Sequence, residues 1–143
     1  MDRKQLMVGL VKPVAVASLW LSACGSTASG PPPIALDETP CAHCGMLVSD
    51  LAFAAAYRTE DGDARIFDEI GCLLRDLPSS GARVFVHDYE TSEWLDGDAA
   101  FYVRSESIQT PMGGGIVAFS SREAAERHEG EILGLSDLKA GSR

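Results

Sequence analysis

Between positions 51 and 119 the apolar residues fall into short runs that end at turn residues, a pattern typical of β-strands. Residues 51–58 form one such run, and residues 64–67 form a second run after Asp61-Gly62, so together they predict a hairpin. The alternating residues 83–88, rich in Val and Phe, predict another strand. Further short strands are expected at three places: Trp94-Leu95, residues 99–103 and residues 116–119.

Two segments have the spacing of helices instead. From Asp68 to Leu77 the apolar residues recur at i, i+3, i+4 and i+7, with Asp68 as the expected N-cap and Pro78 just beyond the end. Residues 121–129 predict a second helix that begins at Ser121. Strands and helices that do not alternate regularly predict a single α+β domain with a small antiparallel sheet over residues 35–130. The polar residues 131–143 are expected to fray as a tail.

The first 23 residues have the composition of a secretory signal rather than of a fold. Arg3 and Lys4 precede an apolar run over residues 13–21, which is too short to span a bilayer. The run closes with Leu-Ser-Ala-Cys, which resembles the bacterial lipobox, so Cys24 is the expected site of lipid attachment. Residues 24–34 are rich in Gly, Ser and Pro and predict a flexible tether between the membrane and the domain.

The chain is acidic, with a formal net charge of −9, and removal of the basic signal leaves the rest more acidic still. Such a charge disfavours nucleic acid and anionic membrane surfaces as partners. It suits cationic ligands or basic protein partners.

The cysteines and methionines suggest a metal site. With Cys24 assigned to lipid, three of the four cysteines remain, so at least one thiol stays outside any intramolecular disulfide. The segment Cys41-Ala42-His43-Cys44-Gly45-Met46 brings two thiols, an imidazole and a thioether into six residues. Thiolate and thioether sulfur select Cu(I), whereas Zn(II) has little use for a thioether. The sequence therefore predicts a soft-metal site, with Cu(I) as the ion.

Met112 is a candidate second thioether ligand. It follows Pro111 and precedes three glycines, which must form a loop because glycine is costly to hold in a helix or strand. The alternative is that Met112 fills the edge of the core. His43 is equally well explained as a third ligand or as an exposed imidazole.

Other residues have simpler explanations or open alternatives. Cys41 and Cys44 could form a redox disulfide, as Cys-x-x-Cys pairs do in thioredoxin-like proteins. Cys72, on the apolar side of the first helix, is more often a buried small hydrophobe than a ligand. Asp68 and Glu69 near the start of that helix are explained by capping and dipole effects. No Ser/His/Asp order, phosphate loop or zincin helix is found in the sequence.

The ordered set of motifs resembles one known family. The lipobox Cys24, Cys-x-x-Cys-Gly-Met at 41–46, Phe-Asp-Glu-Ile-Gly-Cys-Leu at 67–73, Ala-Phe-Tyr-Val at 100–103 and Pro-Met-Gly at 111–113 are similar to the NosL family of copper-binding lipoproteins of the nitrous oxide reductase system. The resemblance implies an α+β domain with ββαβ-like modules, similar to part of the organomercurial lyases. It also implies a ligand set: Cys44 and Met46, with Cys41, Met112 and His43 in support.

The function that the resemblance implies is a copper chaperone rather than an enzyme. It would hold Cu(I) in the bacterial cell envelope, facing the periplasm and anchored to the outer rather than the inner membrane. It would pass the ion to the copper–sulfur centre of the nitrous oxide reductase apoprotein, or to a membrane assembly complex, and pairing of two copies stays open. The alternatives are a membrane-anchored thiol–disulfide oxidoreductase that uses Cys41 and Cys44, and an organomercurial-lyase-like enzyme for which Cys72 and Asp68 would matter.

Overall fold

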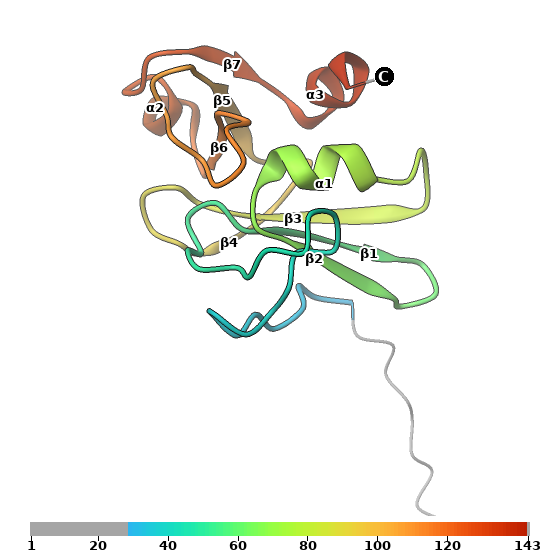
Figure 1. The fold of residues 1–143 in the computed structure, drawn as a ribbon. Helices are drawn as coiled ribbons and strands as arrows, with labels where there is room; N and C mark the ends of the chain where they lie inside the picture. The colour runs from blue at the N-terminus through green and yellow to red at the C-terminus, as the bar shows by residue number, and fades with distance from the viewer. Residues whose placement is uncertain (1–28, 143) are drawn as a thin grey trace, which may run out of the picture.

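The computed structural model describes residues 29–142 of the 143-residue chain (Figure 1). The expected signal over residues 1–23 and the expected acylation site at Cys24 lie outside the described residues, as does part of the tether. Within residues 29–142, no helix combines the length and the apolar character needed to cross a bilayer.

The described residues form two small antiparallel sheets and three short helices, which confirms the predicted α+β class. The elements follow in the order β1 (Ala55–Thr59), β2 (Ala64–Phe67), α1 (Ile70–Asp76), β3 (Ala82–His87), β4 (Trp94–Asp96), β5 (Phe101–Arg104), β6 (Ile116–Phe119), α2 (Arg122–Ala125), β7 (Glu131–Leu133) and α3 (Leu135–Gly141). The first sheet has the order β2-β1-β3-β4 and the second has the order β6-β5-β7.

α1 lies on the face of the first sheet that is turned towards the second sheet (Figure 1). The two sheets are joined by a parallel bridge between Asp88 and Ala118, at the end of β3 and within β6. One continuous core is built from both sheets and two helices: its fully buried members include Phe67, Leu73, Tyr102 and Leu138. The two sheets therefore share one core.

The predicted hairpin is confirmed. β1 and β2 pair with Ala55 opposite Phe67 and Arg58 opposite Ala64, and Gly62 in the turn has a φ of +93°, which favours glycine. β1 begins later than predicted because residues 51–54 form a turn, which is closed by the Ala54 N–H donating to the Leu51 carbonyl at 3.1 Å. β6 spans the predicted residues.

The first helix differs from its prediction at the start. α1 begins at Ile70 with Glu69 at the N-cap position, and no side chain makes a capping hydrogen bond. The expectation that Asp68 caps the helix is therefore wrong. The carboxylates of Asp68 and Glu69 accept hydrogen bonds from residues outside the helix instead. The second helix begins as predicted, because the Ser121 hydroxyl accepts a hydrogen bond from the Ala124 N–H. It ends early, at Ala125, since the chain must turn back at Gly130 to form β7.

The prediction of a fraying polar tail after residue 130 is wrong for the described residues 131–142. β7 pairs with β5, with Leu133 opposite Tyr102 and Glu131 opposite Arg104. α3 then buries Leu135 and Leu138 in the main core. The two leucines are three residues apart, so they share one face of a helical turn, and this apolar face holds the end of the chain in place.

Candidate metal centre

Four side chains converge beside the start of α1. One ligand atom from each of Cys41, Cys44, Asp68 and Cys72 lies within 4.8 Å of all the others. The three cysteines are free thiols, and all but Cys44 are buried. We call these four residues the thiol cluster. Three sulfur atoms and one carboxylate at this spacing are a donor set for a single soft cation.

The loop before β1 brings Cys41 and Cys44 to the same place. A bridge between Pro40 and Leu47 closes the loop, and within it the Cys41 N–H donates to the Met46 carbonyl at 2.7 Å. The Gly45 N–H donates back to the Cys41 carbonyl at 2.9 Å, and Gly45 adopts a φ of +80°. This left-handed glycine makes the tight turn possible.

The other two donors come from the junction between β2 and α1. Asp68 follows the last residue of β2, and Cys72 lies one helical turn further on, so both side chains face the loop. The Cys44 thiol donates to Oδ2 of Asp68 over 3.5 Å. The Ala42 N–H donates to the Ile66 carbonyl at 2.8 Å and ties the loop to β2.

The carboxylate of Asp68 is incompletely satisfied. Asp68 is 2% exposed, and its Oδ1 is buried without a hydrogen-bond partner among the described residues. A buried acceptor without a partner costs free energy, and in a native protein it needs an explanation. A cation held by the neighbouring sulfur atoms would compensate this oxygen, so the donor set fits a bound metal.

Burial and the nearby carboxylate keep two of the thiols protonated in the absence of a cation. Burial raises the pKa of the Cys72 thiol well above its ordinary value, and the hydrogen bond and negative charge of Asp68 raise it further. Burial also raises the pKa of the Cys44 thiol, against the opposing effect of a hydrogen bond from the Met46 backbone. A metal ion must displace these protons, so metal uptake should release protons into solution.

The residues predicted as ligands are only partly brought together. Cys41 and Cys44 belong to the thiol cluster. Met46 follows them in the same loop, but its side chain is half-exposed, and the side chain of Met112 is similarly open, at 43%. His43 is exposed and does not belong to the cluster. The interpretation of Cys72 as a mere core residue is incomplete, because its thiol faces the other donors.

Two cluster residues, Cys72 and Asp68, were not among the predicted ligands. A signal for them exists in the sequence, because Asp68 and Cys72 are four residues apart and therefore share one face of a helical turn. The approach of this face to Cys41, which lies 31 residues before Cys72, cannot be predicted from local sequence.

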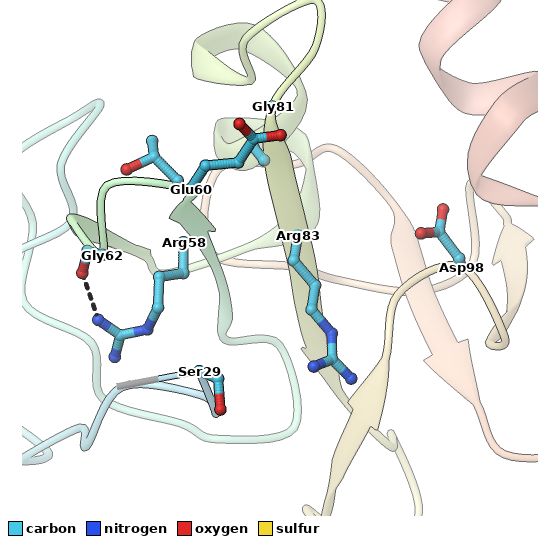
Figure 2. Close-up of a pocket in the computed structure, with 9 residues that line it drawn as sticks. Ser29, Arg58, Glu60, Gly62, Gly81, Arg83 and Asp98 are labelled. Carbon is cyan, nitrogen blue, oxygen red and sulfur yellow. Dashed lines mark hydrogen bonds between the residues drawn. The ribbon is translucent and has the colours of Figure 1, made fainter. Parts of the chain in front are cut away.

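A cavity of about 470 Å³ lies elsewhere on the molecule (Figure 2). None of the thiol cluster residues lines it. Arg58 and Arg83 project towards this cavity, but Arg58 donates to the Gly62 and Gly30 carbonyls and Arg83 pairs with Asp96 at 2.7 Å. Glu60 and Asp98 also line it, so its two arginines are matched in number by two carboxylates, and the described residues that line it include no sulfur or imidazole donor for a metal.

The fold and the donor set together define a small α+β protein with a soft-metal centre. Residues 33–142 match the model of the NosL family, so the chain belongs to that family, and the predicted resemblance is confirmed. The fold is similar to the crystal structure of the copper chaperone NosL from Shewanella denitrificans, with a TM-score of 0.62 and 21% sequence identity over 76% of this chain and 96% of that chain. None of the curated proteins compared matches the chain.

Proposed function

We propose that this protein is a Cu(I) carrier of the bacterial cell envelope and not an enzyme. The observation that carries the proposal is the convergence of three free thiols on the buried carboxylate of Asp68, within 4.8 Å. Membership of the NosL family supports copper as the cargo, since the structurally similar member is a copper chaperone.

The thioethers favour Cu(I) over Zn(II). Thiolates alone would suit either ion, but Met46 and Met112 add a donor type that Zn(II) rarely uses. Both side chains are exposed, although long apolar side chains are usually buried. We propose that Cys44 and Met46 are the principal ligands, that Cys41, Cys72 and Met112 contribute, and that His43 has at most a supporting part.

The exposure of the donors suggests how the ion leaves. Cys41 and Cys72 are buried, Cys44 is partly buried and Met46 is half-exposed. An incoming partner would therefore meet the Met46 and Cys44 sulfur atoms first and could replace them one at a time. Such stepwise ligand exchange allows tight binding together with fast transfer.

The client and the anchor belong to the same proposal. The ion would be delivered to the copper–sulfur centre of nitrous oxide reductase, through the apoprotein or a membrane assembly complex. Acylation of Cys24 would hold the domain at the membrane, facing the periplasm, and residues 24–34 would give it reach. A single acyl chain gives only marginal membrane binding, so stable anchoring would need more than one acyl chain on this acidic protein.

An anaerobic Cu(I) titration of the reduced protein against a chromophoric chelator tests the proposal. We expect one Cu(I) per chain, with a sulfur-dominated first shell in X-ray absorption, and much weaker Zn(II) binding. The double variant Cys44→Ala/Met46→Ala should lose at least ~100-fold in Cu(I) affinity, about 2.7 kcal/mol. Leu47→Ala is the matched control, because Leu47 is equally exposed in the same loop and bears no donor.

The same variants separate the carrier from the other two classes. If the protein took up no Cu(I), or if the double variant bound it as well as the parent, the proposal would be wrong. A thiol–disulfide oxidoreductase would reduce a test disulfide at the same rate after Met46→Ala. An organomercurial lyase would release the hydrocarbon from phenylmercury and would also tolerate that change. We expect neither reaction to turn over.

A further inference from the structure

Glu69 uses its carboxylate in a way that helix capping does not explain. The residue is 1% exposed and stands at the N-cap position of α1, but its side chain makes no capping bond. Its Oε2 instead accepts hydrogen bonds from the backbone N–H groups of Met112, at 3.0 Å, and Gly114, at 3.4 Å. These partners lie 43 and 45 residues further along the chain. The carboxylate thus joins the start of α1 to the loop that carries Met112.

Two glycines make room for this contact. A Cβ atom on Gly71 would lie 2.5 Å from Oε1 of Glu69, and one on Gly114 would lie 2.7 Å from the same oxygen. Neither glycine has a positive φ, so close approach and not backbone conformation requires glycine there. The two glycine backbones also face each other, because a Cβ on Gly71 would contact the Gly114 Cα at 3.6 Å. The first turn of α1 and the loop therefore meet around one buried carboxylate.

The loop itself is preformed. We call residues 110–115 the Met112 loop. Within it the Gly113 N–H donates to the Thr110 carbonyl and the Gly115 N–H donates to the Thr110 hydroxyl, both at 3.0 Å. Gly113, Gly114 and Gly115 also line a cavity of about 450 Å³ on one side of the loop. The bonds to Glu69, together with the bond from the Ser105 N–H to the Gly115 carbonyl at 2.8 Å, attach the Met112 loop to the body of the protein.

This attachment lies next to the thiol cluster. Glu69 follows Asp68 directly and precedes Cys72 by three residues, and both of those side chains belong to the cluster. We propose that Glu69 is a positioning residue: it holds the Met112 loop against the start of α1, so that the Met112 thioether stands beside the thiol cluster and shares in holding Cu(I). The inference rests on the proposed function, because it gives the loop a part in copper binding.

The first test concerns the metal-free protein. In the full chain, reduced and without copper, Glu69→Ala should increase the hydrogen-exchange rates of the Met112 and Gly114 amides by about tenfold or more, because both lose their acceptor. Glu69→Gln should keep most of the protection, since the amide oxygen can accept both bonds. Glu106→Ala is the control, because it removes an exposed carboxylate from the neighbouring segment. Unchanged exchange in Glu69→Ala would overturn the inference.

The second test is a double-mutant cycle with Cu(I). Glu69→Ala and Met112→Ala should each lower the Cu(I) affinity by about tenfold, as losses of supporting groups at metal sites do. The double variant should be no weaker than Met112→Ala alone, because both changes remove the same contribution. A merely structural role of Glu69 would instead give independent, additive losses. Additive effects would overturn the inference.

A further variant covers the case in which Glu69→Ala does not fold. Gly114→Ala keeps the carboxylate but places a Cβ only 2.7 Å from its Oε1, so it should release the loop and reproduce both effects. The failures are distinguishable. If the parent protein binds Cu(I) and Met112→Ala does not change the affinity, this inference fails while the proposed function stands. If the parent binds no Cu(I), the proposed function fails, and so does the inference that Met112 shares in holding the ion.

Discussion

The buried carboxylates of the molecule differ sharply between the junction of the two sheets and the start of α1. At the junction, Asp88 accepts hydrogen bonds from the N–H groups of Glu90, Thr91 and Ser120, at 2.9, 3.1 and 2.8 Å. At the start of α1, Asp68 and Glu69 each retain one buried oxygen without a hydrogen-bond partner among the described residues. A buried oxygen without a partner needs an explanation, and within the part of the chain that the structure describes Asp68 and Glu69 each have one whereas Asp88 has none.

The pKa of Asp88 agrees with this difference. Burial by itself acts to raise the pKa of Asp88, but the backbone N–H groups stabilise the ionised form and hold the pKa below its ordinary value. Asp88 thus gains from folding in its charged state. Within residues 29–142, the carboxylate of Asp68 accepts a side-chain hydrogen bond from the Cys44 thiol, and its Oδ1 has no partner. The comparison indicates that Asp68, unlike Asp88, is placed for a cation and not for the stability of the metal-free protein.

The sheets also contribute unequally to the site. Every member of the thiol cluster comes from the chain before β3, whereas the Met112 loop, which we propose supplies a further ligand, lies between β5 and β6. The second sheet and α3 mainly complete the core beneath the site. Four predictions, taken from the largest expected effect to the smallest, test this division of roles.

Leu138→Ala tests whether the two sheets fold as one unit. Leu138 is fully buried in the core shared by both sheets, so the change should lower the free energy of unfolding by about 2–5 kcal/mol. Denaturant unfolding followed by both Trp fluorescence and circular dichroism should show a single, shifted transition. The exposed Ser136→Ala in the same helix should have little effect. Two separate transitions, with the first sheet unaffected, would show that the sheets are independent.

Cys72→Ser tests whether the buried end of the thiol cluster takes part in metal binding. Serine is similar in size but is a hard donor, so the Cu(I) affinity should fall by ~100-fold, about 2.7 kcal/mol. His43→Ala should change it by no more than about twofold, because the imidazole is exposed and outside the cluster. Competition titrations with a Cu(I) chelator measure both. An unchanged Cu(I) affinity in Cys72→Ser would mean that Cys72 is a core residue and not a ligand.

Asp88→Asn and Asp68→Asn compare the two carboxylates directly. Asp88→Asn puts an amide where three N–H groups need acceptors, which should lower the free energy of unfolding by ~1–3 kcal/mol. Asp68→Asn should leave the stability of the copper-free protein unchanged or slightly higher, while weakening Cu(I) binding. Equal destabilisation by both changes would contradict the distinction between them.

The Asp88 comparison also has a pH dependence. The folded pKa of Asp88 is depressed, so its contribution to stability is complete above the unfolded pKa of about 3.9 and is lost as the pH falls through the lower folded value. Denaturant unfolding of the parent should therefore show a loss of stability below about pH 4 that is smaller in Asp88→Asn. A loss of the same size in both proteins would assign the acid sensitivity to other carboxylates.

The sequence predicts the features that short-range chemistry determines. The β1–β2 hairpin follows from two apolar runs around Asp61-Gly62, and the start of α2 follows from the hydroxyl of Ser121. The start of α1 is mispredicted because Asp68 and Glu69 resemble capping residues. Their actual partners are Cys44, 24 residues before Asp68, and Met112, 43 residues after Glu69. No local pattern encodes contacts at that distance.

The same limitation explains the other two errors. Cys72 in an apolar helix looks like a core residue until tertiary structure places Cys41 and Cys44 opposite it. The end of the chain looks polar because only a few apolar residues, among them Leu135 and Leu138, decide its burial. Candidate donors in the Cys41–Met46 segment were found because they are close in sequence, whereas Asp68 and Cys72 join them only through the fold.

The hydrogen bond between Ala42 and Ile66 gives the Cys41–Met46 loop a structural role in addition to the proposed metal binding. β2 is an outer strand of the first sheet, and such a strand offers unpaired backbone groups to any other extended chain. The Ala42 N–H donates to one of these groups, the Ile66 carbonyl, and the Arg65 side chain donates a hydrogen bond to the Ala42 carbonyl at 3.2 Å. The loop that we propose releases the metal ion thus also covers part of the edge strand β2. A large displacement of this loop would expose the edge of the sheet and promote self-association.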